Sequence, residues 1–334
     1  MGVPTTRVRV LRHDDVVAAL DMTACIDAME AAFTAYASGL AELPVVIQLE
    51  VPEHAGEIHI KAGHLHGEGH YAVKIASGFP GNPELGLPAA DGVVLVFDAR
   101  TGAPAALLFD RGHITDVRTG AAGGVAARHL APASPGAVAV IGSGVQARMQ
   151  IDALSRVRSF DEVRVWGRGA AKAEHAADDI RALPSLPAGC AVRPAASVED
   201  AVRDAGVVIT ATASREPLLR AAWLAPGAHV TALGSDQPDK RELETDVLAR
   251  ADVVVADSVP QCLAIGELGH AVEAGAVDPA AVVELGAITG GTAKGRTEDG
   301  ELTVCDLTGV GVQDVAAAIL VMVSAGDAGT TLEL

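Results

Sequence analysis

The sequence predicts an α/β protein with a doubly wound parallel sheet, joined to a smaller α+β domain. Short apolar runs alternate with helical segments after residue 136, which is typical of a parallel sheet covered by helices. One such run, at 138–141, leads directly into a glycine-rich turn and a helix. The chain has 334 residues, which is long enough for two domains that each have a core.

The first part of the chain has a different pattern. Ile26, Met29, Phe33 and Tyr36 recur at the spacing of one helix face. A helix is also expected at 115–130, where the sequence is rich in alanine. Between these helices lie β-like runs separated by glycine and proline, at 45–51, 57–62, 71–76, 93–98 and 105–110.

The segment 131–136 contains two prolines and is the expected domain boundary. After it, strands are expected at 137–141, 162–166, 207–211, 229–233 and 252–256, with helices from residue 145 and near 170–180. A strand at 301–305 and an apolar helix at 312–323 break this alternation, and we expect the chain to return there to the first domain. The predicted domains are therefore 1–130 with 306–334, and 131–305.

The turn after the strand at 137–141 is the most informative motif. Gly142, Gly144 and Ala147 form a G-x-G-x-x-A pattern between a strand and a helix. The glycines allow a tight turn close to a ligand, and the helix N-terminus offers N–H groups to a pyrophosphate. The motif predicts a Rossmann-type dinucleotide site, with Val145 and Gln146 also at the cofactor. The alternative is a strand-turn-helix unit that binds no nucleotide.

The residues after the second strand bear on the choice of nicotinamide cofactor. An Asp or Glu there favours NAD, whereas an Arg accommodates the 2′-phosphate of NADP. This chain has Arg168, followed by Lys172, and no acid. We therefore expect NADP(H), with NAD(H) as the alternative if Arg168 is an ordinary surface residue.

Composition and charge argue against several classes of partner. The net charge is −18 and aromatic residues make up 3%, which disfavours nucleic acid and anionic membranes. The four cysteines show no C-x-x-C spacing, the N-terminus is too charged for a signal peptide, and no apolar run approaches the ~20 residues of a membrane span. We expect a cytoplasmic protein without nucleic-acid or membrane partners.

Five histidines lie within residues 54–70, and an H-x-H pair on a strand could bind zinc. Glycine-rich loops interrupt this group, and no acid or cysteine spacing completes a ligand set. We therefore expect no metal, and we expect these histidines in exposed loops.

Three charged residues are candidates for chemistry. Lys74 lies between Val73 and Ile75 in a β-like run, and Arg118 lies in a helix rich in alanine and glycine. Asp236 follows the strand at 229–233, at the edge where ligands bind in open α/β sheets. For each residue the alternative is a structural salt bridge or a solvated loop.

The chain resembles the ornithine cyclodeaminase/mu-crystallin family over nearly its whole length. The matching segments are 73–75, 82–88 (NPELGLP), 98–102 (DARTG), 114–122 (ITDVRTGAA), 141–147 (IGSGVQA), 234–236 with 242–243, and 306–314 (DLTGVGVQD). The resemblance implies a nicotinamide-dependent enzyme that acts at an amino-acid C–N bond. It also implies a homodimer formed by the first domain, which binds substrate, and the C-terminal helix. The stretch at 166–168 is similar to the branch that uses NADP.

The resemblance also implies roles for single residues. Lys74 and Arg118 would bind the substrate carboxylate, with Lys74 and Asp236 as the catalytic residues. Thr119, Thr212 and Gly234 are further candidates for cofactor contact. Many family members carry an arginine in the early strand at 45–49, where this chain has Gln48 without a charge. Lys61 is the candidate replacement, so both are counted among the substrate-binding residues.

Three functions remain open at this stage. The first is an imine reductase or amino-acid dehydrogenase that transfers hydride at the C–N bond of an α-imino or α-amino acid. The second is a redox-neutral cyclodeaminase that converts ornithine or lysine and releases ammonia. The third is a non-catalytic, crystallin-like protein that binds NADP, and the presence of Lys74, Arg118 and Asp236 together argues against it.

Overall fold

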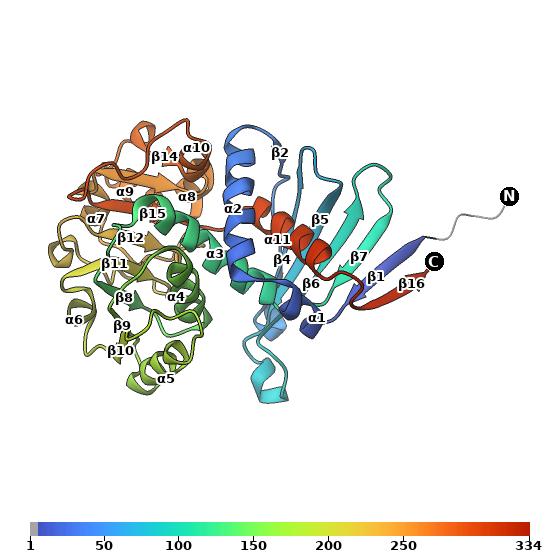
Figure 1. Ribbon diagram of the computed structural model, residues 1–334, viewed down its shortest axis with the longest axis horizontal. Coiled ribbons are helices and arrows are strands. Elements are labelled where there is room, and N and C mark those ends of the chain that lie inside the picture. The colour runs from blue at the N-terminus through green and yellow to red at the C-terminus, as the bar shows by residue number, and fades with distance from the viewer. Residues whose placement is uncertain (1–5) are drawn as a thin grey trace. The chain divides into compact units, whose positions relative to one another are not determined.

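The structure is a computed structural model that describes residues 6–334 (Figure 1). The chain forms two compact units, one of Met1–Arg118 with Gly311–Leu334 and the other of Thr119–Val310. Each unit contains one eight-stranded sheet. Within residues 6–334, no helix has both the length and the apolar character that crossing a membrane requires.

The sheet of the first unit is mostly antiparallel. Its strand order is β16-β1-β7-β6-β5-β4-β2, with β3 paired to β4, and only the β1–β7 pair is parallel among the strands described. The strands are β1 (Arg7–Leu11), β2 (Ala41–Glu42), β3 (Ile47–Val51), β4 (Gly56–Leu65), β5 (His70–Gly78), β6 (Ala90–Asp98), β7 (Pro104–Leu108) and β16 (Thr330–Glu333). Short 3₁₀ turns occur at η1 (Pro52–His54) and η2 (Asn82–Leu85).

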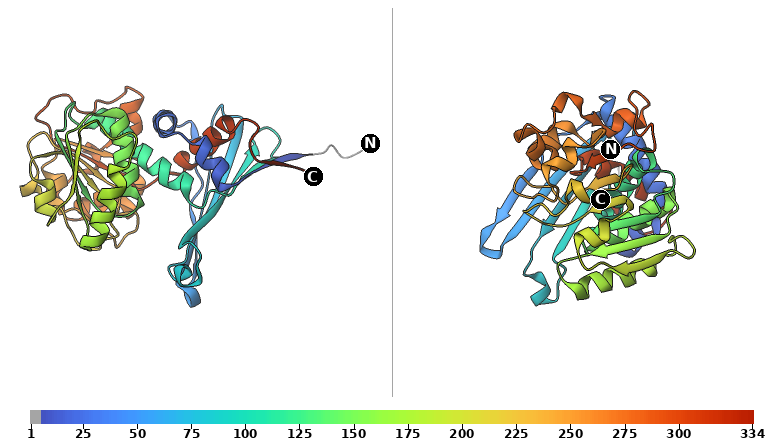
Figure 2. Two further views of the ribbon diagram at one scale, coloured as in Figure 1. Left: turned by 60° about the horizontal axis from the view of Figure 1, so that its bottom comes forward. Right: turned by 90° about the vertical axis from the view of Figure 1, so that its left-hand side faces the viewer.

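Helices cover one face of this sheet, as Figure 2 shows. They are α1 (His13–Ala19), α2 (Met22–Ala37) and α11 (Gly311–Ser324), and α11 packs on α2, β4 and β5. The helical spacing expected near the N-terminus is confirmed, since Ile26, Met29 and Phe33 of α2 are fully buried. Strand residues alternate between the two faces, so Val94 and Val96 of β6 are buried beneath the helices.

The second unit contains the expected parallel sheet. Its order is β10-β9-β8-β11-β12-β15-β13-β14, and all neighbouring strands are parallel. The strands are β8 (Ala137–Ile141), β9 (Glu162–Trp166), β10 (Ala191–Pro194), β11 (Ala205–Thr210), β12 (His229–Ala232), β13 (Val253–Ala256), β14 (Val283–Glu284) and β15 (Thr303–Asp306). The α/β class with a doubly wound sheet is therefore confirmed.

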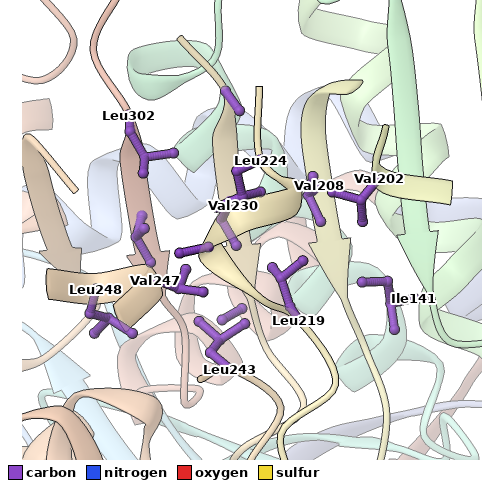
Figure 3. Close-up of a cluster of buried hydrophobic side chains, with 14 of the residues drawn as sticks. Ile141, Val202, Val208, Leu219, Leu224, Val230, Leu243, Val247, Leu248 and Leu302 are labelled. Atoms are coloured by element: carbon purple, nitrogen blue, oxygen red, sulfur yellow. The ribbon is translucent and has the colours of Figure 1, made fainter. Parts of the chain in front are cut away.

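Helices flank this sheet on both faces (Figure 1). They are α4 (Val145–Val157), α5 (Ala170–Arg181), α6 (Val198–Val202), α7 (Thr245–Ala249), α8 (Val259–Ile265), α9 (Glu267–Glu273) and α10 (Leu285–Thr289), with 3₁₀ turns η3 (Ala221–Trp223) and η4 (Pro279–Ala281). Figure 3 shows one of the apolar layers, in which Val208 and Val230 of neighbouring strands pack with Leu219 and Leu243 from the connecting segments.

The division between the units lies inside helix α3 (His113–Leu130), before the proline-containing segment at which we expected it. The glycines of α3 explain this difference. A Cβ on Gly120 would lie 2.8 Å from the Met149 carbonyl oxygen of α4, and one on Gly123 would lie 1.8 Å from Gln150 Oε1. The second half of α3 therefore packs closely against α4 of the second unit. Strand β15 also belongs to the sheet of this unit, and the chain returns to the first unit at Gly311.

Candidate functional site

The glycine turn after β8 lines a cavity of about 470 Å³ in the second unit. The strand order reverses between β8 and β11, which is where ligands bind in doubly wound sheets. Gly142 has φ +138°, and a Cβ there would lie 2.5 Å from the Ala211 carbonyl oxygen, so only glycine fits. Helix α4 begins after Gly144 without a side-chain cap, which leaves its N-terminus suited to an anionic group.

The cofactor candidates fall into two groups. Gly142, Gly144, Arg168 and Thr212 line the cavity. The others do not line it: Val145 and Gln146 open α4, Ala147 is fully buried, the Thr119 carbonyl accepts a hydrogen bond from Gln150 Nε2 at 2.9 Å, and the Gly234 N–H donates to Glu242 at 2.9 Å. The residues of the first group are therefore the candidates for direct contact with a dinucleotide, and those of the second group lie outside the lining of the cavity.

The cavity carries positive charge where the second strand ends. Arg168 and Lys172 both line it beyond Trp166, and no acidic residue is among the lining residues. Neither cation forms an ion pair with any residue of the range 6–334. Both side chains are therefore available to a further anionic group of a bound ligand.

A second constellation lies in the first unit, where β5, α3 and α11 contribute one charged residue each. Lys74 Nζ lies 2.7 Å from Asp314 Oδ1 and 3.2 Å from Thr115 Oγ1. Arg118 Nε lies 3.2 Å from the same Asp314 oxygen, and its Nη1 donates to Gln313 Oε1 at 2.9 Å. Lys74, Arg118 and Asp314 are each at most 6% exposed. Two cations thus face one carboxylate, and one positive charge remains uncompensated.

The electrostatics of this constellation follow from burial. Burial lowers the pKa of Lys74 to about 8; Asp314 opposes this effect, and Arg118 and Lys61 add to it. Burial alone would raise the pKa of Asp314, but Lys74, Arg118 and Lys61 outweigh it and hold the value at about 2. Asp314 is therefore an anion at neutral pH. Its Oδ2 is buried and has no hydrogen-bond partner within residues 6–334.

The other two substrate candidates lie on the same sheet face. Lys61 of β4 is directly opposite Lys74 of β5. Gln48 of β3 is opposite His59, which is two residues from Lys61 and so points to the same side. Gln48 is exposed, whereas Lys61 is half-buried and influences the pKa values of both Lys74 and Asp314.

Asp236 belongs to the second unit and not to the lysine–arginine constellation of the first. It follows β12 at the carboxyl edge of the parallel sheet, as expected. Its side chain is 52% exposed, and Oδ1 lies 2.5 Å from Lys240 Nζ. Asp236 is thus a solvent-accessible carboxylate next to a lysine, on a loop held by the Ser235 hydroxyl, which donates to the Lys240 carbonyl at 2.8 Å.

Two buried acids were not identified as site residues from the sequence. Asp314 has a recognisable signal, because it is the one acid in the apolar stretch 312–323. Glu242 lies in a segment that matched the family, but its contacts to Thr212 and Gly234 depend on the fold.

The histidines differ from the expectation of exposed loops. His59 and His64 lie on β4, and His70 begins β5. Within residues 6–334, no three histidine, cysteine, aspartate or glutamate side chains are grouped so that they could hold a metal ion.

Comparison with known proteins identifies the family of the chain. The model of the ornithine cyclodeaminase/mu-crystallin family matches residues 7–328. An alanine dehydrogenase from Archaeoglobus fulgidus is 34% identical over 313 residues, which are 93% of each chain.

Solved structures show the same fold. The Δ1-pyrroline-2-carboxylate reductase of Thermococcus litoralis, in complex with NADH and L-proline, has a TM-score of 0.89 and 30% identity, over 96% of this chain and 99% of that chain. An archaeal alanine dehydrogenase dimer with bound NAD has a TM-score of 0.87 and 33% identity, over 98% and 99%. The resemblance expected from the sequence is confirmed, and the chain belongs to the ornithine cyclodeaminase/mu-crystallin family.

Proposed function

We propose that this protein is a nicotinamide-dependent oxidoreductase that transfers hydride at the C–N bond of an α-imino or α-amino acid. One observation carries the proposal. The chain combines a dinucleotide cradle with a buried lysine–arginine pair that retains net positive charge. Its relatives include an alanine dehydrogenase and a pyrroline-carboxylate reductase, which act at such bonds.

In this proposal Arg118 and Lys74 bind the substrate carboxylate. The planar guanidinium offers paired donors to a carboxylate, and the lysine adds a point charge. Asp314 holds both cations from one side through its Oδ1. Because the net charge of the protein is −18, this local positive charge is needed to hold an anionic substrate.

The proposed reaction also requires proton transfer. The bound nicotinamide supplies the hydride. Reduction of a C=N bond also requires a proton at nitrogen, and Asp236, accessible to solvent and next to Lys240, is the proposed relay. Lys74 has a pKa of about 8, so it can also exchange a proton near neutral pH.

For the cofactor we propose a preference for NADP(H) over NAD(H). Arg168 and Lys172 line the cavity just beyond β9, where the 2′-phosphate of NADP is bound in other Rossmann domains. The absence of an acid from the residues that line this cavity supports the same preference.

We also propose a homodimer through the first unit. The sheet face opposite α2 and α11 carries partly exposed apolar side chains, and Tyr71 and Phe97 stack on it at 5.0 Å between ring centroids. The side chains are Ile47, Leu49, Ile58, Ile60, Val73, Ile75, Val93, Leu95 and Leu107. Continuous apolar patches of this kind mark interaction sites, and the archaeal alanine dehydrogenase is a dimer.

The experiment that tests the function is product analysis by mass spectrometry. The protein is incubated with cyclic imino acids and NADPH, and in parallel with ornithine or lysine and a trace of NAD⁺. We expect stoichiometric oxidation of NADPH with formation of the reduced amino acid. Loss of ammonia without net change in the cofactor would instead establish a cyclodeaminase. Binding of NADPH without turnover in either reaction would contradict an enzymatic role with these substrates.

A further inference from the structure

Glu242 connects two loops at the carboxyl edge of the parallel sheet. Its side chain is fully buried. Oε1 accepts hydrogen bonds from the Thr212 N–H at 2.6 Å and from the Thr212 hydroxyl at 2.7 Å, and Oε2 accepts one from the Gly234 N–H at 2.9 Å. Burial raises the pKa of Glu242, and the donors from Thr212 and Gly234 act against that rise. A buried carboxylate is costly unless such donors satisfy it.

The two connected loops have different tasks in the proposed reaction. Thr212 follows β11 and lines the nucleotide cavity. Gly234 follows β12 and lies two residues before Asp236, the proposed proton relay. The contact between the loops is tight, since a Cβ on Gly234 would lie 2.2 Å from the Thr212 carbonyl oxygen and 2.5 Å from Glu242 Cδ. The two loops therefore cannot shift independently while Glu242 holds both.

The backbone of Glu242 is fixed by a second buried acid, Glu267. Glu267 of α9 is 1% exposed, and its carboxylate accepts hydrogen bonds from the Glu242 N–H at 2.5 Å and the Leu243 N–H at 3.2 Å. Leu243 is 1% exposed and packs into the apolar layer of Figure 3. The backbone of Glu242 is thus fixed to the core, and the hydrogen bonds of its side chain hold the loops at Thr212 and Gly234 in place relative to that core.

We infer that Glu242 is a positioning residue that sets the nucleotide-binding loop at Thr212 against the loop that carries Asp236. The inference rests on the proposed function, because it assigns the cofactor and the proton relay to these two loops. It adds a residue outside the lining of the nucleotide cavity whose two carboxyl oxygens hold the two loops together.

The test is Glu242→Gln in the full-length protein. The amide oxygen can still accept from Thr212, but the amide NH₂ faces the Gly234 N–H, so a donor opposes a donor. Losing this contact should weaken NADPH binding about 3- to 10-fold and lower kcat with an imino acid about 10- to 100-fold. The dissociation constant is read from fluorescence, since Trp166 lines the cavity.

Asp257 provides a matched control. It is also fully buried, and it accepts hydrogen bonds from the N–H of Thr308 at 2.9 Å, the N–H of Gly309 at 2.8 Å and the Thr308 hydroxyl at 3.0 Å. It does not line the nucleotide cavity. Asp257→Asn should lower the thermal midpoint as Glu242→Gln does, but should leave the Kd for NADPH within about twofold of wild type.

The Kd comparison decides the inference. A Glu242→Gln protein whose Kd for NADPH matches that of Asp257→Asn overturns it, whatever its kcat. If the wild type binds NADPH but reduces no imino acid, the proposed function fails, and the Kd comparison still tests the link to the Thr212 loop. If Glu242→Gln does not fold, Glu242→Asp keeps the carboxyl group but shortens the side chain by one methylene, which draws it away from the donors of Thr212 and Gly234, and it should weaken NADPH binding about threefold.

Discussion

The buried ion pair of Lys74 and Asp314 predicts how kcat/KM depends on pH. Lys74 has a pKa of about 8, and in the proposed function only its protonated form would attract the substrate carboxylate. The value of kcat/KM for an imino acid should therefore be highest below about pH 8 and should fall about tenfold per pH unit above it. Asp314 lies 2.7 Å from Lys74 Nζ and favours the charged lysine.

Replacing Asp314 by asparagine should move this pH dependence. The amide keeps the shape of the side chain but loses the charge, so burial and Arg118 lower the pKa of Lys74 without opposition from Asp314. A hydrogen bond to a charged group contributes about 1.5–3 kcal/mol, and one pKa unit corresponds to about 1.4 kcal/mol. The break in the pH profile should therefore shift down by about one to two units.

The assay is the initial rate of NADPH oxidation between about pH 6 and about pH 10, analysed as kcat/KM. Titration of the substrate itself is common to both proteins and cancels in the comparison. Asp152→Asn is the control, since Asp152 forms a surface ion pair with Arg156 at 3.1 Å within one helix. A break that stays in place in Asp314→Asn would refute the proposed coupling of Lys74 to Asp314.

Three further predictions concern the cofactor, the packing of α3 and stability. Arg168→Ala should raise the KM for NADPH about 10- to 100-fold and change the KM for NADH much less, because a charge-assisted contact to the 2′-phosphate is lost; an unchanged ratio of the two values would contradict the NADP preference. Gly120→Ala places a Cβ 2.8 Å from the backbone carbonyl oxygen of Met149 and should cost about 1–3 kcal/mol in urea unfolding. Gly300→Ala, with no atom within 4 Å, is its control, and equal losses would argue against tight packing of α3 on α4. Burial lowers the pKa of His229 from 6.5 to about 3, so below about pH 6.5 the unfolded chain binds a proton that the folded chain does not. Stability should fall by about 2 kcal/mol at about pH 5, and a His229→Gln variant should lose this part of the pH dependence.

Local patterns predicted the elements that are long or strongly periodic. The helix with Ile26, Met29 and Phe33 and the alternation of strands after residue 136 were both evident from the sequence. The strands β10, β14 and β16 were not, because their sequences AVRP, VE and TTLE contain no continuous apolar run. The unit boundary inside α3 was missed because no turn or linker residues mark it. It depends on the close packing of Gly120 and Gly123 against α4, which the sequence does not show.

The sequence by itself determined the dinucleotide fold and the position of its cradle, because the G-x-G-x-x-A turn connects a strand and a helix that are contiguous. It also supplied Lys74, Arg118 and Asp236 as candidates, through their surroundings and the family resemblance. Only the tertiary structure decided which charges meet. Asp314 lies 240 residues from Lys74 in the chain, and packing of α11 on β5 brings the two within 2.7 Å. Burial then determines their charge states, because desolvation and neighbouring charges depend on the fold and not on local sequence.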